Sequence, residues 1–480
     1  MNRFRIANRT LGTLLLVAAL AGAVIVWQSV SPRGTVGAVT RVQGMELLDA
    51  VARNVQSIYI ERAVSNETLY EGAIKGLLDA AGQSCARAVN DQNAPAGGSR
   101  DRVASLVDSI GQRCSPRPET DRLFFGAAKG MLESLGDPYS RFMDPRAYQE
   151  FRQDAQGFFF GIGIFIDLRD EHLIVVQPIP RTPAARAGLR AGDRITHVDG
   201  ASTEGMALQE AVTRIRGPKG TTVRLMIQRA SRSFEVSIVR DRIEIIAAEG
   251  PESLDAGVRD KLRQARIGYV KLITFNDNSV KAFDRLIADA QRAGMRALIF
   301  DLRNNGGGLL DISLGIADRF IPAGKPLVHT VDRNGKRETD RATRRPKITI
   351  PVVVLVNEYS ASASEIVAGA LQDHGLATLV GTKTFGKGKI QSVINLPLGS
   401  GAAITTAKYL TPNGRDLNQI GPLTPNEVVG VREEVLRQRL KGQSEEEMER
   451  RLNQMRAEQL AKAIAILKMK MRSSVVRPAA

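Results

Sequence analysis

The chain has 480 residues, 43% of them hydrophobic, so it is long enough for about three domains with sizeable cores. Its 67 Lys and Arg residues outnumber its 51 Asp and Glu residues, which gives a formal net charge of +16. The basic residues are interleaved with acidic ones and form no dense run, so a nucleic-acid partner is not expected. A solvated basic surface near an anionic membrane explains the charge better.

The N-terminus has the pattern of a secretory signal. Met1–Arg5 carries two arginines, and an apolar run extends from Leu11 to Trp27. Ala21-Gly22-Ala23 is a candidate cleavage site, but the apolar run continues beyond it and approaches the length that spans a membrane. We expect residues 1–34 to be an uncleaved signal anchor, with a cleaved signal peptide as the alternative. Both versions place the bulk of the chain in the periplasm or cell envelope, and the anchor would hold it at the inner membrane.

Helical signals dominate residues 41–150. Glu46–Tyr59 has amphipathic spacing, and Asn66 is the predicted cap of the helix that follows it. A short repeat occurs in the same region, because Gly72–Leu78 and Gly126–Leu132 share a Gly-Ala-x-Lys-Gly-x-Leu pattern. We therefore expect an N-terminal helical region.

Two cysteines, Cys85 and Cys114, flank a polar stretch of this region. Outside the cytoplasm cysteines tend to pair, so we expect one disulfide that closes the stretch, with two free thiols as the alternative. They do not resemble metal ligands, because no histidine or acidic cluster has suitable spacing. No metal and no other cofactor is expected.

Residues 156–242 contain three glycine-rich turns that resemble those of a PDZ domain. They are Gly161-Ile162-Gly163-Ile164, Pro183–Leu189 and Gly192–Ile195. The resemblance implies that Gly161–Ile164 receives the C-terminal carboxylate of a peptide on successive backbone N–H groups, while the peptide adds a strand to the sheet. The helix beside the ligand would be Ala207–Arg216. A generic small β domain is the alternative.

Residues 243–430 alternate apolar strands with helical stretches, which indicates a βαβ arrangement. The predicted strands are Gly268–Ile273, Ala297–Leu302 and Val352–Val356, and the predicted helices are Asn278–Ala293 and Ala361–Gln372. Ser362 follows the apolar run Pro351–Val356 through a turn of small residues that leads into a helix. This order places a hydroxyl at the end of a sheet, near the positive end of a helix dipole. Lys387 lies 25 residues later between two glycines. A lysine can activate a serine if burial keeps its amine neutral.

The local pattern also allows a structural interpretation. Ser362-Ala363-Ser364-Glu365 has the form of a capping box, so the Ser362 hydroxyl could simply cap the helix. Local chemistry does not choose among Ser360, Ser362 and Ser364.

A histidine base is not expected. The chain has four histidines, His172, His197, His329 and His374, and only His374 is near the serines in sequence. A continuous helix rising about 1.5 Å per residue would separate His374 from Ser362 by roughly 18 Å, whereas a hydrogen bond requires about 3 Å. The sequence therefore predicts serine hydrolase chemistry without histidine.

Three segments together resemble the carboxy-terminal processing proteases, a family of Ser/Lys peptidases that carry a PDZ domain. They are Asp301–Gly308, Val356–Glu365 and Thr384–Gln391. Their order and spacing fit the family, and the likeness extends from about Arg41 to Leu467. The resemblance implies a multi-domain α/β protein with a helical N-terminal region, a PDZ domain, a crotonase/ClpP-like α/β peptidase core and a helical C-terminal tail.

The resemblance also implies roles for single residues. The nucleophile falls on Ser362, the general base on Lys387, and the glutamine that orients the base on Gln391. The oxyanion hole of this family consists of backbone N–H groups, which fall on Ala363 and Gly308, with Gly307 as the alternative. The expected partners are proteins with unstructured C-termini, and an adaptor or activator and a homo-oligomer stay open.

Some segments depart from the family pattern or are not explained by it. Only the second copy of the repeat continues into Asp137–Arg141, as the family does, so the cysteine-bounded segment is interpreted as an insertion. Asn426 stands where the family usually has aspartate. In the tail, residues 431–480, we expect one charged helix at Glu446–Met471, which packs on the core, mediates oligomers or is simply solvated.

Two other function classes compete with a peptidase. One is a catalytically inactive PDZ scaffold or adaptor of the envelope, and the presence of Ser362, Lys387 and Gln391 together argues against it. The other is an acyl-CoA enzyme of the crotonase type, which would leave the PDZ-like segment and Lys387 unexplained.

Overall fold

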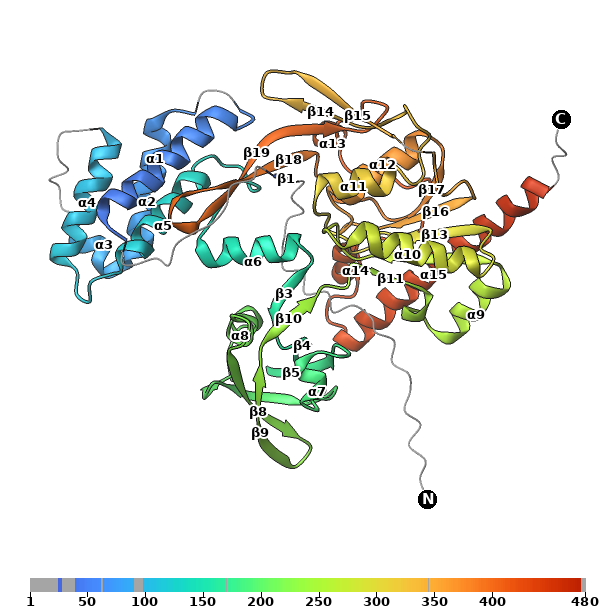
Figure 1. The fold of residues 1–480 in the computed structure, drawn as a ribbon, viewed down its shortest axis with the longest axis horizontal. Helices are drawn as coiled ribbons and strands as arrows, with labels where there is room; N and C mark the ends of the chain where they lie inside the picture. The colour runs from blue at the N-terminus through green and yellow to red at the C-terminus, as the bar shows by residue number, and fades with distance from the viewer. Residues whose placement is uncertain are drawn as a thin grey trace. The chain divides into compact units, whose positions relative to one another are not determined.

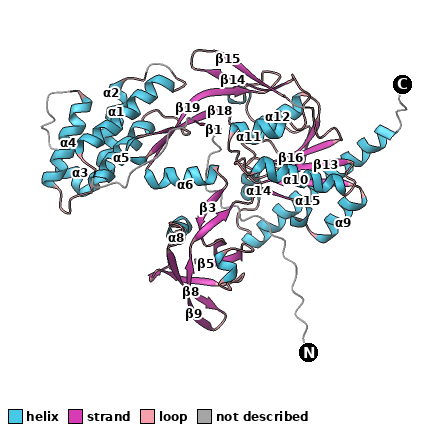
Figure 2. Ribbon diagram, viewed as in Figure 1, coloured by secondary structure: helices cyan, strands magenta, loops and turns pink. Residues whose placement is uncertain are grey.

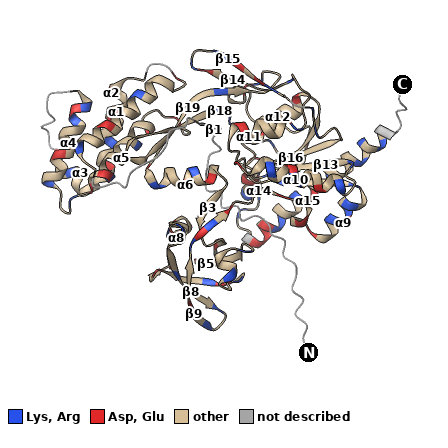
Figure 3. Cartoon of the chain, viewed as in Figure 1, with Lys and Arg blue, Asp and Glu red and all other residues tan. Residues whose placement is uncertain are grey.

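A computed structural model describes residues 25–27, 39–61, 64–89, 98–169, 171–343 and 345–475. It divides into two compact units: Gln153–Ala247 form the smaller one, and Ala19–Arg152 with Ala248–Ala480 form the larger one. The expected signal anchor lies outside the described residues except for strand β1, Ile25–Trp27. Within the described ranges, no helix is long and apolar enough to cross a membrane. Both basic and acidic residues are distributed over the elements of both units (Figure 3).

The larger unit begins with helices. They are α1 (Arg41–Ile58), α2 (Asn66–Ala81), α3 (Gln83–Val89), α4 (Ser99–Arg113), α5 (Thr120–Glu133) and, after β2 (Arg141–Met143), α6 (Pro145–Ala155) (Figure 1). The predicted cap of α2 is wrong by one residue, because the Ser65 hydroxyl accepts the Thr68 N–H at 3.0 Å and Asn66 is the first helical residue. Cys85 and Cys114 form a disulfide that joins α3 to the end of α4, with Cα atoms 5.3 Å apart.

The glycine repeat explains why α2 and α5 pack so closely. A Cβ atom added at Gly76 would lie 2.1 Å from the Gly126 carbonyl oxygen, and one at Gly72 would lie 2.5 Å from that of Gly130. The two copies therefore face one another, and any larger side chain would push the helices apart. The repeat is thus a packing device within the helical region.

The smaller unit is a β-sheet domain. Its elements are β3 (Phe158–Gly161), β4 (Ile164–Arg169), β5 (His172–Pro178), α7 (Pro183–Arg186), β6 (Arg194–Val198), β7 (Ala201–Ser202), α8 (Leu208–Ile215), β8 (Thr222–Arg229), β9 (Arg232–Val239) and β10 (Asp241–Glu244). The main sheet has the order β4-β5-β6-β8-β9 with β7 beside β6, and β3 pairs with β10. Its core contains Leu173, Ile195 and Leu225, which are fully or almost fully buried.

The peptidase core is a mostly parallel sheet with helices on both faces (Figure 2). Its strands follow the order β11 (Ala248–Glu249), β12 (Ile267–Leu272), β13 (Ala297–Asp301), β16 (Val352–Val356), β17 (Ala377–Gly381) and β20 (Glu427–Val428), with only β11 antiparallel to its neighbour. The helices are α9 (Ala256–Gln264), α10 (Ser279–Arg292), α11 (Leu310–Ala317), α12 (Ala363–Asp373), α13 (Leu417–Ile420), α14 (Glu433–Arg439) and α15 (Glu445–Val475).

Alternating side chains of this sheet divide between two cores. Phe300 and Val354 point toward α10, α11 and α12, whereas Ile299 and Val353 pack with residues of α9 and α15. On α15 the packing residues include Leu460. The C-terminal helix therefore covers one face of the catalytic sheet, which is the first of the three options that the sequence leaves for the tail.

A second sheet links the peptidase core to the N-terminal helices. It contains β1, β18 (Lys389–Asn395), β19 (Gly401–Leu410), β14 (Pro326–Asp332) and β15 (Arg337–Arg341), with β2 paired to β19. The pairing of Ala403 with Arg141 brings the segment before β2 beside β19. Residues more than 250 positions apart are thereby in contact, as the Ser140 and Thr405 hydrogen bond illustrates with a sequence separation of 265.

Candidate active site

Ser362 stands at the turn between β16 and α12 in an unusual backbone conformation. Its φ of +55° and ψ of −113° lie where residues other than glycine are rarely found, and such strain costs on the order of 1–3 kcal/mol. The residue is 0% exposed. Its Oγ has no hydrogen-bond partner among the described residues. Ser362 and Glu365 have the arrangement of a capping box, in which the Ser362 N–H donates to Glu365 Oε2 at 2.9 Å.

The two neighbouring serines have structural hydrogen bonds instead. Ser360 Oγ donates to the Leu302 carbonyl at 2.8 Å and accepts the Asn357 N–H at 3.0 Å. Ser364 Oγ donates to the Asn305 carbonyl at 2.8 Å. Both hydroxyls tie the turn to the loop that follows β13. Of the three serines, Ser362 alone has an uncommitted hydroxyl within the described part of the chain.

Lys387 is the buried cation of the site. It is 1% exposed, and its Nζ lies 4.5 Å from the centroid of the Tyr139 ring. Burial, followed by the charge of Arg141, lowers the pKa of Lys387 to about 7. A large fraction of this amine is therefore neutral near pH 7, as a general base requires.

Two side chains hold the backbones of Ser362 and Lys387 together. Glu365 Oε2 accepts the N–H of each residue at 2.9 Å, and its Oε1 accepts the Gly386 N–H at 2.7 Å. The hydroxyl of Tyr409 lies 2.5 Å from the Lys387 carbonyl oxygen and 3.3 Å from that of Ser362. Burial raises the pKa of Glu365 to about 7, and the donated hydrogen bonds oppose that rise.

Sequence reasoning missed these two holding residues. It assigned Glu365 only to a helix cap, although the position of this carboxylate within the Ser362 motif was a usable signal. Tyr409 lies in a segment, Thr405–Arg415, that also resembles the family, but no role was predicted for it, because its partners lie 47 and 22 residues away in the chain.

Gln391 lies on β18 and is 1% exposed. Its Nε2 donates to Thr405 Oγ1 at 3.2 Å. Its Oε1 is buried and has no partner among the described residues. An acceptor of this kind is available to a proton donor inside the site.

The glycine loop after β13 lies against the nucleophile turn. A Cβ atom added at Gly307 would be 2.8 Å from the Ala361 carbonyl oxygen and 3.0 Å from Ser362 Cβ. The Gly307 N–H is committed, because it donates to Asn305 Oδ1 at 2.9 Å. The N–H groups of Gly308 and Ala363 have no partner among the described residues.

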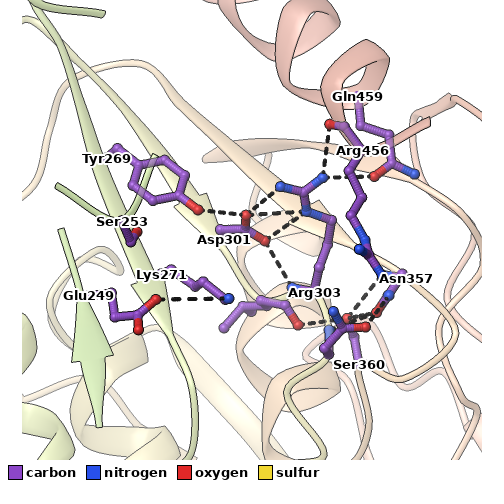
Figure 4. Close-up of polar contacts among 12 residues, drawn as sticks. Glu249, Ser253, Tyr269, Lys271, Asp301, Arg303, Asn357, Ser360, Arg456 and Gln459 are labelled. Carbon is purple, nitrogen blue, oxygen red and sulfur yellow. Dashed lines mark hydrogen bonds and ion pairs between the residues drawn. The ribbon is translucent and has the colours of Figure 1, made fainter. Parts of the chain in front are cut away.

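A buried ion pair fixes the start of this loop (Figure 4). Arg303 donates to Asp301 Oδ2 at 2.6 Å, and the Tyr269 hydroxyl donates to the same oxygen at 2.9 Å. On its other side, Arg303 donates to Gln459 Oε1 of α15 at 3.0 Å. The C-terminal helix thus contacts the residue from which the glycine loop departs.

The histidines near the peptidase core are engaged elsewhere. His374 directly follows α12, and its Nε2 lies 2.7 Å from the Pro326 carbonyl oxygen. His329 Nε2 lies 3.1 Å from the Pro412 carbonyl oxygen, and its Nδ1 lies 2.7 Å from Thr339 Oγ1. Neither histidine contacts Ser362.

In the smaller unit, the turn between β3 and β4 also presents unpaired N–H groups. Those of Ile162 and Gly163 have no partner among the described residues. The Gly163 carbonyl accepts the Ile179 N–H at 2.9 Å and the Thr182 hydroxyl at 3.0 Å. Gly163 has a φ of +79°, and an added Cβ atom would lie 2.4 Å from Thr182 Cβ. The turn is thus anchored through its carbonyl while its N–H groups stay open.

Comparison with known proteins identifies the family of this chain. The pattern of peptidase family S41 matches residues 266–429, and that of the PDZ domain matches residues 174–229. The carboxyl-terminal-processing protease of Picosynechococcus sp. is 40% identical over 67% of this chain and 76% of the relative. The carboxy-terminal-processing protease of Bartonella bacilliformis is 38% identical over 71% of this chain and 76% of the relative. A solved structure of a photosystem II D1 C-terminal processing protease is 29% identical, covers 82% of this chain and 94% of its own, and has a TM-score of 0.45. This chain therefore belongs to the carboxyl-terminal processing proteases of peptidase family S41, and it is a serine-type peptidase with a PDZ domain.

Proposed function

We propose that the protein is an endopeptidase in which Ser362 is the nucleophile, Lys387 is the general base and Gln391 orients the base. One observation carries the proposal. Ser362 has a strained backbone and a buried, uncommitted hydroxyl, and Glu365 binds its N–H together with that of the buried Lys387. The hydroxyls of the neighbouring Ser360 and Ser364 instead form hydrogen bonds to backbone carbonyl groups.

The proposed reaction begins with a proton transfer. Neutral Lys387 takes the proton of Ser362 Oγ while Oγ forms a bond to the scissile carbonyl carbon. The N–H groups of Ala363 and Gly308 stabilise the negative charge on the carbonyl oxygen. Protonated Lys387 then gives its proton to the leaving amine as the peptide bond breaks, which leaves an acyl-enzyme. Water, deprotonated by Lys387, attacks the ester, and the proton returns to Ser362 as the product leaves.

The environment of Lys387 makes this route feasible near neutral pH. A lysine with an ordinary pKa near 10.4 is neutral in only about one molecule in 2,500 at pH 7. Burial lowers the pKa of Lys387 to about 7, so roughly half of the molecules hold the neutral amine at that pH. The gain in reactive base is on the order of a thousandfold.

We further propose that the PDZ domain selects substrates by their C-termini. The unpaired N–H groups of Ile162 and Gly163 suit a terminal carboxylate, and the flanking residues Gly161 and Ile164 end β3 and begin β4. The substrates would be proteins with unstructured C-termini. An envelope or periplasmic location is part of the proposal, and the Cys85–Cys114 disulfide supports an oxidising compartment.

The test is cleavage of an unfolded protein that ends in an apolar C-terminus. We expect Ser362→Ala and Lys387→Ala to abolish cleavage while each variant stays folded and still binds a C-terminal peptide. Lys383→Ala is the matched control, because Lys383 is an exposed lysine on the same loop. Cleavage that survives in either dyad variant would overturn the assignment, and a wild type that binds peptide without turnover would favour the scaffold.

A further inference from the structure

A buried carboxylate from the N-terminal region reaches the back of the active site. Asp137 lies between α5 and β2, and its side chain is 1% exposed. Its Oδ2 accepts the Thr405 hydroxyl at 2.5 Å and the Ser140 hydroxyl at 2.7 Å. Lys389 Nζ lies 3.7 Å from its Oδ1. The carboxylate is therefore fully enclosed by donors from three segments of the larger unit.

The direction of these hydrogen bonds fixes the orientation of Gln391. As a carboxylate, Asp137 accepts hydrogen bonds and donates none, so the single hydroxyl proton of Thr405 must point at it. Thr405 Oγ1 is then an acceptor toward Gln391, which requires the amide NH₂ of Gln391 to face Thr405. The amide oxygen of Gln391 must face the other way, where it is buried without a partner among the described residues.

The same segment also contacts the base. Tyr139, two residues after Asp137, places its ring 4.5 Å from Lys387 Nζ. The ring face attracts an ammonium group. One short stretch, Asp137–Tyr139, therefore acts on Lys387 directly and on Gln391 through Thr405.

We propose that Asp137 is a positioning residue for the peptidase reaction, acting through Thr405 to hold the Gln391 amide with its oxygen free for the Lys387 amine. A lysine amine held by this oxygen directs its lone pair at one target, the Ser362 hydroxyl. This inference rests on the roles proposed above for Lys387 and Gln391. It gives the N-terminal region a part in the chemistry besides its packing.

Reversing the direction of the hydrogen bonds from residue 137 to Thr405 should turn the Gln391 amide around. An asparagine at position 137 could donate to Thr405 Oγ1, which would free the Thr405 proton to point at Gln391. The amide would then turn its oxygen toward Thr405 and its NH₂ toward Lys387, where it would repel the ammonium form and occupy the lone pair of the neutral amine. Asp137→Asn also removes a negative charge that raises the pKa of Lys387. The other charged groups that act on Lys387 are Arg141 and Glu365, which all variants described next retain.

The deciding experiment compares full-length variants in steady-state cleavage over a pH range. Thr405→Val keeps the shape but removes the relay hydroxyl, and we expect kcat to fall about tenfold or more with KM within about twofold and the acid limb of the profile unmoved. Thr405→Ser should restore kcat to within about threefold of wild type. Asp137→Asn should lower kcat similarly and move the acid limb to lower pH. The matched control is Thr406→Val, whose hydroxyl pairs with Ser392 on the same two strands at 2.9 Å.

Several outcomes would overturn the inference. One is a kcat of Thr405→Val equal to that of wild type. Another is a loss of kcat in Thr405→Ser or Thr406→Val as large as that in Thr405→Val. The third is a loss of kcat that a smaller folded fraction, measured by thermal unfolding, fully explains. Ser362→Ala and Lys387→Ala are run in the same assay. If those two variants stay active, the proposed function fails, whereas normal activity of Thr405→Val alone refutes only the role of Asp137.

Discussion

Two turns, one in each compact unit, present backbone N–H groups that have no partner among the described residues. In the larger unit these groups belong to Ala363 and Gly308, and in the smaller unit they belong to Ile162 and Gly163. Unpaired N–H groups attract negative charge wherever it arises. The two turns therefore share one electrostatic feature, and they differ in the side chains around it.

The surroundings of the two turns suit them to different tasks. Beside the first lie an uncommitted hydroxyl on Ser362 and a buried amine on Lys387 whose pKa burial lowers to about 7. Beside the second lies Thr182, whose hydroxyl is committed to the Gly163 and Ile179 carbonyls. Open N–H groups are sufficient to bind a charge that a ligand already carries. Chemistry requires, in addition, a free nucleophile and a base that burial keeps neutral.

The largest effect should come from removing the nucleophile. We expect Ser362→Ala to lower kcat/KM by about 10⁴ or more, because the covalent route is lost. Ser364→Ala loses only a buried hydrogen bond to the Asn305 carbonyl, so it should cost about 1–2 kcal/mol of stability and leave the folded enzyme active. The measurements are steady-state cleavage and denaturant unfolding of both variants. An equal loss of activity in Ser362→Ala and Ser364→Ala would contradict the assignment of Ser362 as the nucleophile and Ser364 as a structural residue.

The pH profile should report the base. In the proposed mechanism the neutral Lys387 amine is the reactive form, so kcat/KM should rise about tenfold per pH unit below a pKa of about 7 and level off above it. Glu365, whose pKa burial raises to about 7, titrates in the same range, so the apparent value belongs to the pair. Lys387→Arg, which stays charged, should lose about 10³-fold on the plateau above pH 7 and should lack the rise in rate with pH. A rate independent of pH from 5 to 9 would contradict this assignment.

The glycine loop after β13, which carries the proposed oxyanion donor Gly308, should be the next most sensitive part. Gly308 has a φ of +145°, and an added Cβ atom would lie 2.2 Å from the Phe275 carbonyl oxygen. Gly308→Ala should displace its N–H and lower kcat by about 10² with little change in KM. Gly335→Ala is a suitable control, because Gly335 also has a positive φ but has open space around its Cβ position. A rise in KM with kcat unchanged would instead assign this loop to substrate binding.

The smallest effect should come from the PDZ turn and should appear in KM. Gly163→Ala places a Cβ atom 2.4 Å from Thr182 Cβ in a strained backbone and should disturb the carboxylate turn. We expect KM for substrates with a free C-terminus to rise about tenfold while kcat is unchanged. Substrates with an amidated C-terminus should not distinguish the variant from wild type. A loss of kcat with both substrates would mean that the two turns do not divide binding and chemistry.

Most of the peptidase fold could be predicted because its signals are local. Continuous apolar runs located strands β12, β13 and β16 to within a residue, since strands buried on both faces need no polar alternation. The start of α12 was predicted two residues early, at Ala361 instead of Ala363. The reason is the positive φ of Ser362, which interrupts the helix where composition alone suggests it begins.

The supporting residues of the site could not be predicted from local patterns. Ser362 satisfies a capping box and a nucleophile turn equally well in sequence, and only its missing hydroxyl partner separates the two. Thr405 and Tyr409 lie on β19, and their contacts arise from tertiary structure. Thr405 contacts Asp137, 268 residues away, and Tyr409 contacts the Ser362 carbonyl, 47 residues away. Such contacts depend on tertiary topology, which periodicity does not encode.

The most direct test of the Ser362–Lys387 dyad is labelling with a fluorophosphonate that reacts with activated serines, followed by peptide mass spectrometry. We predict one label, on Ser362, with a labelling rate that rises with pH through about 7 in wild type and collapses in Lys387→Ala. Ser360 and Ser364 should stay unlabelled, since both hydroxyls are hydrogen-bonded in the fold. A label on either of those serines would contradict the dyad. A labelling rate of Ser362 that does not depend on pH and is unchanged in Lys387→Ala would also contradict it.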